Sequence, residues 1–123
     1  GQVEKLQAVL DQLRELPDYQ DRWSVFIGDF VDRGSDPKTV IDMTLELMRE
    51  HRRTTAIAGN HEFAMGAALG WFPVAPDGHW GPRWVQHYSS ETTFSSYGAP
   101  HGDLERLGRM VPETHREFIT KLP

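Results

Sequence analysis

Cysteine is absent from this chain of 123 residues, which excludes disulfide bonds and thiolate metal sites. The sequence also lacks any apolar run close to the roughly 20 residues that a membrane-spanning helix needs. We therefore expect no membrane partner and a cytoplasmic protein. Internal repeats and low-complexity tracts are absent too, so the sequence predicts folded structure along its length.

Positive charge is scarce: 13 lysine and arginine residues stand against 18 aspartate and glutamate residues, and the net charge is −5. Because nucleic-acid phosphates repel an acidic domain, we expect no binding to a nucleic-acid backbone. An acidic domain can still act on a phosphate ester, since bound cations rather than surface lysines can hold the phosphate. Hydrophobic residues form 38% of the chain, which is enough for a core.

Two short apolar runs, at residues 23–27 and 54–58, are each followed by glycine and polar residues. This pattern predicts buried parallel strands that end in loops. Helical patterns lie before, between and after the two runs, so the order is helix, strand, helix, strand, helix. Such alternation predicts an α/β fold with parallel strands and flanking helices.

The three helical patterns have recognisable ends. The first lies within residues 1–16 and ends at Pro17. The second begins with Asp36 as a cap and Pro37 in the first turn. The third is expected over residues 61–69.

The second half of the chain has a different character. Residues 70–90 are rich in tryptophan, glycine and proline, and predict a loop-rich insert with a small satellite core. Residues 92–98 predict a short helix ended by glycine, and Pro112 predicts the start of a final helix through Thr120. We interpret residues 1–123 as part of one larger domain.

Two polar clusters directly follow the predicted strands: GDFVDRG at residues 28–34 and GNHE at residues 59–62. In open parallel sheets, ligands bind in the crevice beyond the carboxyl ends of the strands. We therefore expect the two clusters to face each other across one crevice.

The residue types in these clusters suit phosphate chemistry. Asp29 can bridge two cations, and Asn60 offers a neutral oxygen ligand to a hard divalent ion. His61 can act as a ligand or as a general acid, and Asp32 can hold such a histidine in one tautomer. Arg33 presents a fork of donors that matches phosphate oxygens. Together they predict metal-assisted hydrolysis of a phosphate ester.

The pair of motifs resembles the second and third signatures of the calcineurin-like metallophosphoesterases, specifically the phosphoprotein-phosphatase branch. That branch includes bacterial serine/threonine phosphatases and symmetrical diadenosine tetraphosphatases. The resemblance implies a partial metallophosphoesterase fold, belonging to a larger α/β sandwich. It spans nearly the whole chain, although its specific part is residues 25–62. The segment that ends in Ser-Tyr-Gly at residues 96–98 adds a weaker likeness to the bacterial enzymes.

The resemblance also implies a role for each site residue. Asp29 would bridge two divalent metal ions, with manganese favoured over iron, zinc, cobalt or nickel, and Asn60 would bind the second metal and touch the phosphate. His61 and Asp32 would form the catalytic pair, with Asp32 orienting His61 as the general acid. Arg33 would bind the substrate phosphate.

The first family motif, Gly-Asp-x-His-Gly, is represented at most by its last glycine, Gly1, and the later metal histidines of the family have no counterpart here. We therefore expect this internal fragment to bind manganese weakly and to have little activity alone. Three functions stay open. The first is a serine/threonine phosphatase that acts on phosphorylated protein or a small phosphate ester. The second is a diadenosine tetraphosphate hydrolase, and the third is an inactive scaffold or binding domain.

Overall fold

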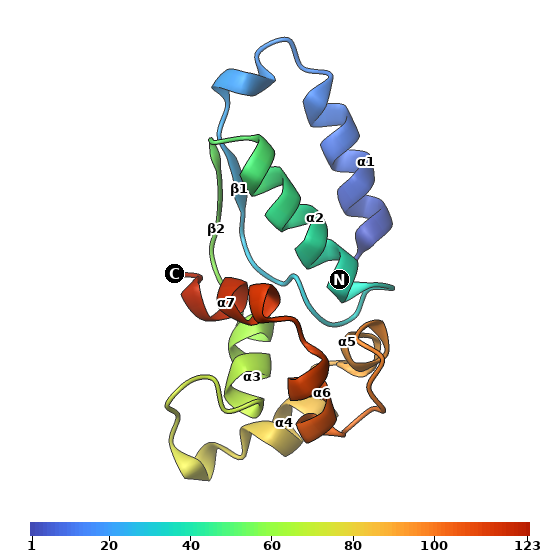
Figure 1. Cartoon of the computed structure of the whole chain (residues 1–123), viewed down its shortest axis with the longest axis vertical. Coiled ribbons are helices and arrows are strands. Elements are labelled where there is room, and N and C mark those ends of the chain that lie inside the picture. Colours follow the sequence, from blue (N-terminus) through green and yellow to red (C-terminus); the bar gives the residue numbers. More distant parts are fainter.

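A computed structural model describes all 123 residues, and Figure 1 traces the chain through them. The α-helices are α1 (Val3–Arg14), α2 (Pro37–Glu50), α3 (Asn60–Ala68), α4 (Trp80–His87), α5 (Glu91–Ser96), α6 (Leu104–Met110) and α7 (Glu113–Lys121). Two 3₁₀ turns, η1 (Tyr19–Asp21) and η2 (Pro76–Gly78), and two strands, β1 (Ser24–Phe26) and β2 (Thr54–Ala56), complete the fold. No helix has both the length and the apolar character that crossing a membrane requires.

The two strands pair in parallel, with Ser24 opposite Thr54 and Phe26 opposite Ala56. Helix α2 makes the crossover between them, and α1 packs against α2 beside the sheet (Figure 1). Asp36 caps α2 as predicted, because its carboxylate accepts hydrogen bonds from the backbone N–H and the hydroxyl of Thr39. The α/β class and the order helix, strand, helix, strand, helix are thus confirmed.

One core joins both halves of the molecule. Ile41 of α2 is fully buried, and it belongs to the same apolar cluster as Trp84 of α4, Phe94 of α5 and Ile119 of α7. Helices α3 and α7 pack together below the carboxyl ends of the strands (Figure 1). The loops that leave the strands are therefore supported from below by helices of the second half.

The expectation that both faces of the first strand are buried is wrong. Trp23, Val25 and Ile27 are 63%, 54% and 79% exposed, whereas Phe26 contacts the core. Successive strand residues point to opposite faces, and the helices cover only one face of this two-stranded sheet. An apolar run indicates that its residues favour burial. It does not indicate which face of the strand another element covers.

The 70–90 segment contains more helix than expected, because residues 80–87 form α4. Gly81 and Pro82, which suggested a loop, occupy the first turn, where proline costs no hydrogen bond. The rest of α4 turns Trp84 into the core, where the side chain is fully buried. Helix α6 was not predicted either, although Asp103 caps it by accepting the N–H of Arg106.

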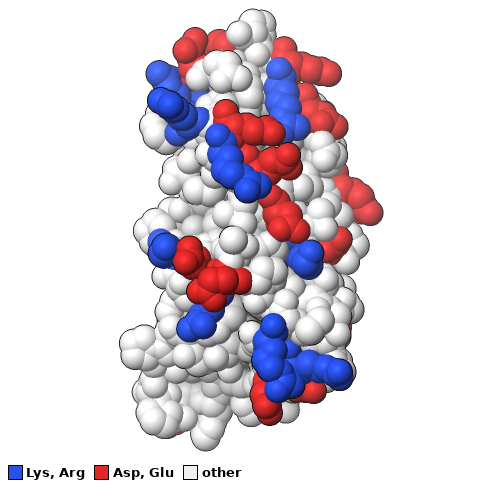
Figure 2. Space-filling view, viewed as in Figure 1, with Lys and Arg blue, Asp and Glu red and all other residues white.

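Charged side chains are mixed over the surface. On the face in Figure 2, acidic and basic residues lie side by side over the upper half, and much of the lower left is uncharged. Some opposite charges pair one helical turn apart, such as Arg109 with Glu105 on α6 and Lys121 with Glu117 on α7. Such exposed pairs stabilise the fold little.

A relay of side chains, buried at Tyr97 and His115 and exposed at Asp42, ties α2 to the second half. The Tyr97 hydroxyl lies 2.7 Å from Nδ1 of His115, whose Nε2 lies 2.6 Å from a carboxylate oxygen of Asp42. Because the carboxylate can only accept, Nε2–H donates to Asp42, and Nδ1 accepts from the tyrosine hydroxyl. The relay thereby joins α2, the end of α5 and α7.

Because of this relay, we expect the folded protein to lose stability at alkaline pH. Burial raises the pKa of Tyr97 well above its usual value, and Asp42 and Asp36 raise it further. The folded state holds the phenolic proton more tightly than the unfolded chain, so the stabilisation is complete below the unfolded pKa of about 10 and is lost at higher pH. We expect the free energy of unfolding to fall more steeply above about pH 10 in the wild type than in Tyr97→Phe.

Urea unfolding at stepped pH measures this difference. Tyr88→Phe is the matched control, since the Tyr88 hydroxyl forms no hydrogen bond within the protein, and it should keep the wild-type slope. Identical slopes for the wild type and Tyr97→Phe would contradict the prediction.

Candidate active site

The loop after β1 has an unusual backbone. Three residues other than glycine adopt positive φ angles: Asp29 at 60°, Asp32 at 68° and Arg33 at 62°. L-residues in this left-handed region each cost roughly 1–2 kcal/mol, so the loop persists only where its surroundings hold it. Two sets of hydrogen bonds hold the loop in this conformation. One set comes from α3 and the other from α5.

Glu62 supplies the first set. Its side chain is fully buried and accepts the backbone N–H of Asp29 at 2.9 Å, of Val31 at 3.1 Å and of Gly59 at 2.8 Å. One carboxylate therefore fastens the loop after β1 to the loop after β2. The sequence indicated only a helix N-terminal acid here, although the spacing of Glu62 from Gly59 matches a capping box.

The two loops touch directly. A side chain on Gly28 would clash with the backbone of Gly59, and one on Gly59 would clash with the carboxylate and backbone nitrogen of Asp29. The two motifs therefore meet at the carboxyl ends of the strands, as expected. This contact depends on glycine at both positions.

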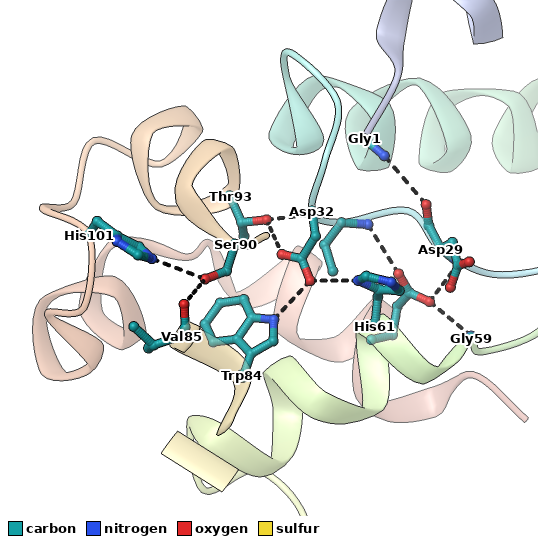
Figure 3. A network of polar contacts seen from close by, with 12 residues as sticks. Gly1, Asp29, Asp32, Gly59, His61, Trp84, Val85, Ser90, Thr93 and His101 are labelled. Carbon is teal, nitrogen blue, oxygen red and sulfur yellow. Dashed lines mark hydrogen bonds and ion pairs between the residues drawn. The ribbon is translucent and has the colours of Figure 1, made fainter. Parts of the chain in front are cut away.

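Asp32 and His61 form a buried pair. Their side chains are almost completely enclosed, and Nδ1 of His61 lies 2.8 Å from Oδ2 of Asp32. The same oxygen accepts the indole N–H of Trp84 at 2.9 Å, and Oδ1 accepts the Thr93 hydroxyl at 2.6 Å (Figure 3). Nε2 of His61 has no hydrogen-bond partner in the protein.

The remaining predicted site residues are exposed. Asp29 and Arg33 line a cavity of about 350 Å³ together with Asp32 and His61. Arg33 forms no ion pair, and the Asp29 carboxylate accepts no hydrogen bond. Asn60 lies exposed at the first position of α3, outside the lining of this cavity.

The other histidines lie apart from this cavity. His101 contacts the hydroxyl of Ser90 at 3.2 Å, and His115 belongs to the relay with Tyr97. His51, at the end of α2, is buried, with Nε2 at 2.9 Å from the carbonyl oxygen of Tyr19. No local sequence pattern indicates this contact.

The site offers oxygen ligands of the type that a hard divalent cation prefers, but it offers too few of them to complete the coordination of the cation. Asp29 and Asn60 offer oxygen ligands. The structure contains no group of three or more histidine, cysteine, aspartate or glutamate side chains that could hold a metal ion. The residues present therefore do not complete a metal centre.

The sequence model described as calcineurin-like phosphoesterase matches residues 1–120. The chain belongs to this family. Its members are in general metal-dependent hydrolases of phosphate esters with two divalent metals, and the partial metallophosphoesterase fold agrees with membership. A search among curated proteins found no match.

The buried carboxylate of Glu62 leads to an expectation that can be tested by mutation. Glu62→Gln should lower the free energy of unfolding by about 3 kcal/mol, because an amide presents one acceptor oxygen to three N–H groups and carries no charge. Denaturant unfolding measures the change. Faster hydrogen exchange at the amides of Asp29 and Val31 should accompany it.

Glu46→Gln is the control, since Glu46 is exposed on α2 and forms no hydrogen bond or ion pair. It should change stability by less than about 0.5 kcal/mol. Equal stability of the Glu62→Gln and Glu46→Gln variants would show that Glu62 does not hold the two loops.

Proposed function

We propose that the site on this chain serves the hydrolysis of phosphate monoesters in an enzyme of the phosphoprotein-phosphatase branch, with His61 as the proton donor. The observation that carries the proposal is the buried Asp32–His61 pair beside Asp29 and Arg33 at one cavity. Nε2 of His61, the Asp29 carboxylate and the Arg33 guanidinium have no hydrogen-bond or ion-pair partner in the protein, and each suits one part of the reaction.

His61 is prepared to give a proton to the leaving group. Asp32 accepts from Nδ1, so a protonated imidazole carries its second proton on Nε2, which has no competing partner in the protein. A departing alkoxide within reach of Nε2 can take that proton, and Asp32 stabilises the imidazolium until then.

Arg33 and Asp29 have complementary tasks. The Arg33 guanidinium is exposed without an ion pair, so it can bind two phosphate oxygens as a fork. Asp29 and Asn60 would hold divalent cations, manganese being our choice of metal. When bound, such cations supply an activated water and neutralise the phosphoryl charge.

A second candidate is a scaffold or phosphate-binding domain without catalysis. The absence of any group of three metal-ligating side chains favours it. The two candidates share Arg33 and Asp29 as phosphate and cation contacts, and they differ only in whether His61 transfers a proton during turnover.

Measuring where the chain binds Mn²⁺ tests whether Asp29 is a metal ligand. Paramagnetic broadening by Mn²⁺ should be strongest at the amides of residues 28–34 and 59–62. Asp29→Asn should weaken the apparent affinity at least about tenfold, because it removes the only charged ligand. Asp77→Asn, at an exposed position in η2, should leave the affinity unchanged. Broadening that survives Asp29→Asn would refute the assignment of Asp29 as a ligand.

Turnover of p-nitrophenyl phosphate with Mn²⁺ tests the chemical step. His61→Asn should reduce turnover by about 10²-fold or more, since it removes the proton donor, while Mn²⁺ affinity stays the same. The comparison is made in the full-length protein that contains this chain, where wild-type turnover in His61→Asn would refute the proposal. If that full-length protein binds Mn²⁺ without turnover, the scaffold candidate is favoured. Comparing a phosphopeptide with diadenosine tetraphosphate then separates the two proposed substrates.

A further inference from the structure

The segment from Trp84 to Thr93, which joins the end of α4 to the start of α5, contacts three residues of the site. The sequence predicted only that Trp84 packs in a small satellite core of residues 70–90. Figure 3 instead places Trp84 and Thr93 directly around the carboxylate of Asp32, on the side away from the loop of Gly59. We call residues 84–93 the clasp segment.

Two side chains of the clasp segment fix both carboxylate oxygens of Asp32. The indole N–H of Trp84 donates to Oδ2 at 2.9 Å, and the Thr93 hydroxyl donates to Oδ1 at 2.6 Å. Trp84 and Thr93 are fully buried, and Asp32 is 1% exposed. Water cannot take over these bonds, so the orientation of the carboxylate depends on the two donors.

The backbone of the strained loop is held by the same segment. The Asp32 N–H donates to the Thr93 hydroxyl oxygen at 2.9 Å, and the Arg33 N–H donates to the carbonyl oxygen of Ser89 at 3.1 Å. The ring of Tyr88 also packs edge-on against the His61 imidazole, with centroids 5.2 Å apart. The clasp segment thus contacts Asp32, Arg33 and His61 at once.

We propose that Trp84 and Thr93 are positioning residues, which fix Asp32 so that Asp32 holds His61 as the Nδ1–H tautomer. Oδ2 of Asp32 accepts from both Trp84 and His61, so a rotation of the carboxylate changes both bonds together. The catalytic meaning of the tautomer rests on the proposed function, whereas the tautomer itself is a property of the folded chain.

Nitrogen-15 NMR of histidine-labelled protein, in mildly alkaline buffer where a free imidazole is neutral, tests the inference. The wild type should hold His61 as the Nδ1–H form. Trp84→Phe keeps the aromatic ring and removes the N–H, and Thr93→Val keeps the shape and removes the hydroxyl. Each should shift His61 toward the Nε2–H form and speed exchange of the Nδ1 proton with water at least about tenfold.

The chain offers a matched control for each variant. Thr92 is the neighbour of Thr93 in α5, and its buried hydroxyl has no hydrogen-bond partner. Trp80 lies one turn before Trp84 in α4, and its indole forms no hydrogen bond. Thr92→Val and Trp80→Phe should leave the His61 tautomer and its proton exchange as in the wild type.

A rescue variant and two contradicting outcomes complete the test of the His61 tautomer. Thr93→Ser restores the hydroxyl and should restore the wild-type tautomer. The inference is overturned if Trp84→Phe and Thr93→Val both fold and keep the wild-type His61 signals. It is also overturned if the unsubstituted protein carries the Nε2–H tautomer, whatever happens to the variants. Because NMR needs no turnover, a chain with the Nδ1–H tautomer but no hydrolysis would count against the proposed function alone.

Discussion

The carboxylate of Glu62 is the contact on which the geometry of the site depends. The loop after β1 contains three left-handed residues other than glycine, each costing roughly 1–2 kcal/mol. Hydrogen bonds to a charged group contribute roughly 1.5–3 kcal/mol each, and Glu62 accepts three. The two sums are of the same order. The bonds that Glu62 accepts can therefore offset much of the strain in the loop that carries Asp29 and Arg33.

The parts of this arrangement that lie within a few residues of one another could be predicted from the sequence. The capping of α2 by Asp36, the alternation of strands and helices, and the position of both polar clusters at strand ends are local patterns. The approach of Asp32 to His61 followed from topology, because parallel strands bring their carboxyl ends to one edge.

The contacts with the clasp segment could not be found in this way. Trp84 reaches Asp32 across 52 residues of sequence. Nothing local separates it from Trp80, which lies one turn earlier and has no such contact. Gly81 and Pro82 act as helix breakers in most contexts but are tolerated here in a first turn, so the helix that presents Trp84 was hidden. Burial of tryptophan was expected, but the partner of its N–H depends on tertiary packing.

The acidic residues of the site divide into two kinds, and this division decides what the site can bind. Glu62 and Asp32 are buried, and each is satisfied by three or more hydrogen bonds from the protein. Their charges are already compensated, so they have little left to offer a ligand. The side chain of Asp29 is exposed and its carboxylate accepts no hydrogen bond, although Asp29 lies in the same loop as Asp32. A cation entering the cavity would therefore find one available carboxylate, and the two buried carboxylates hold that one, and the histidine, in place.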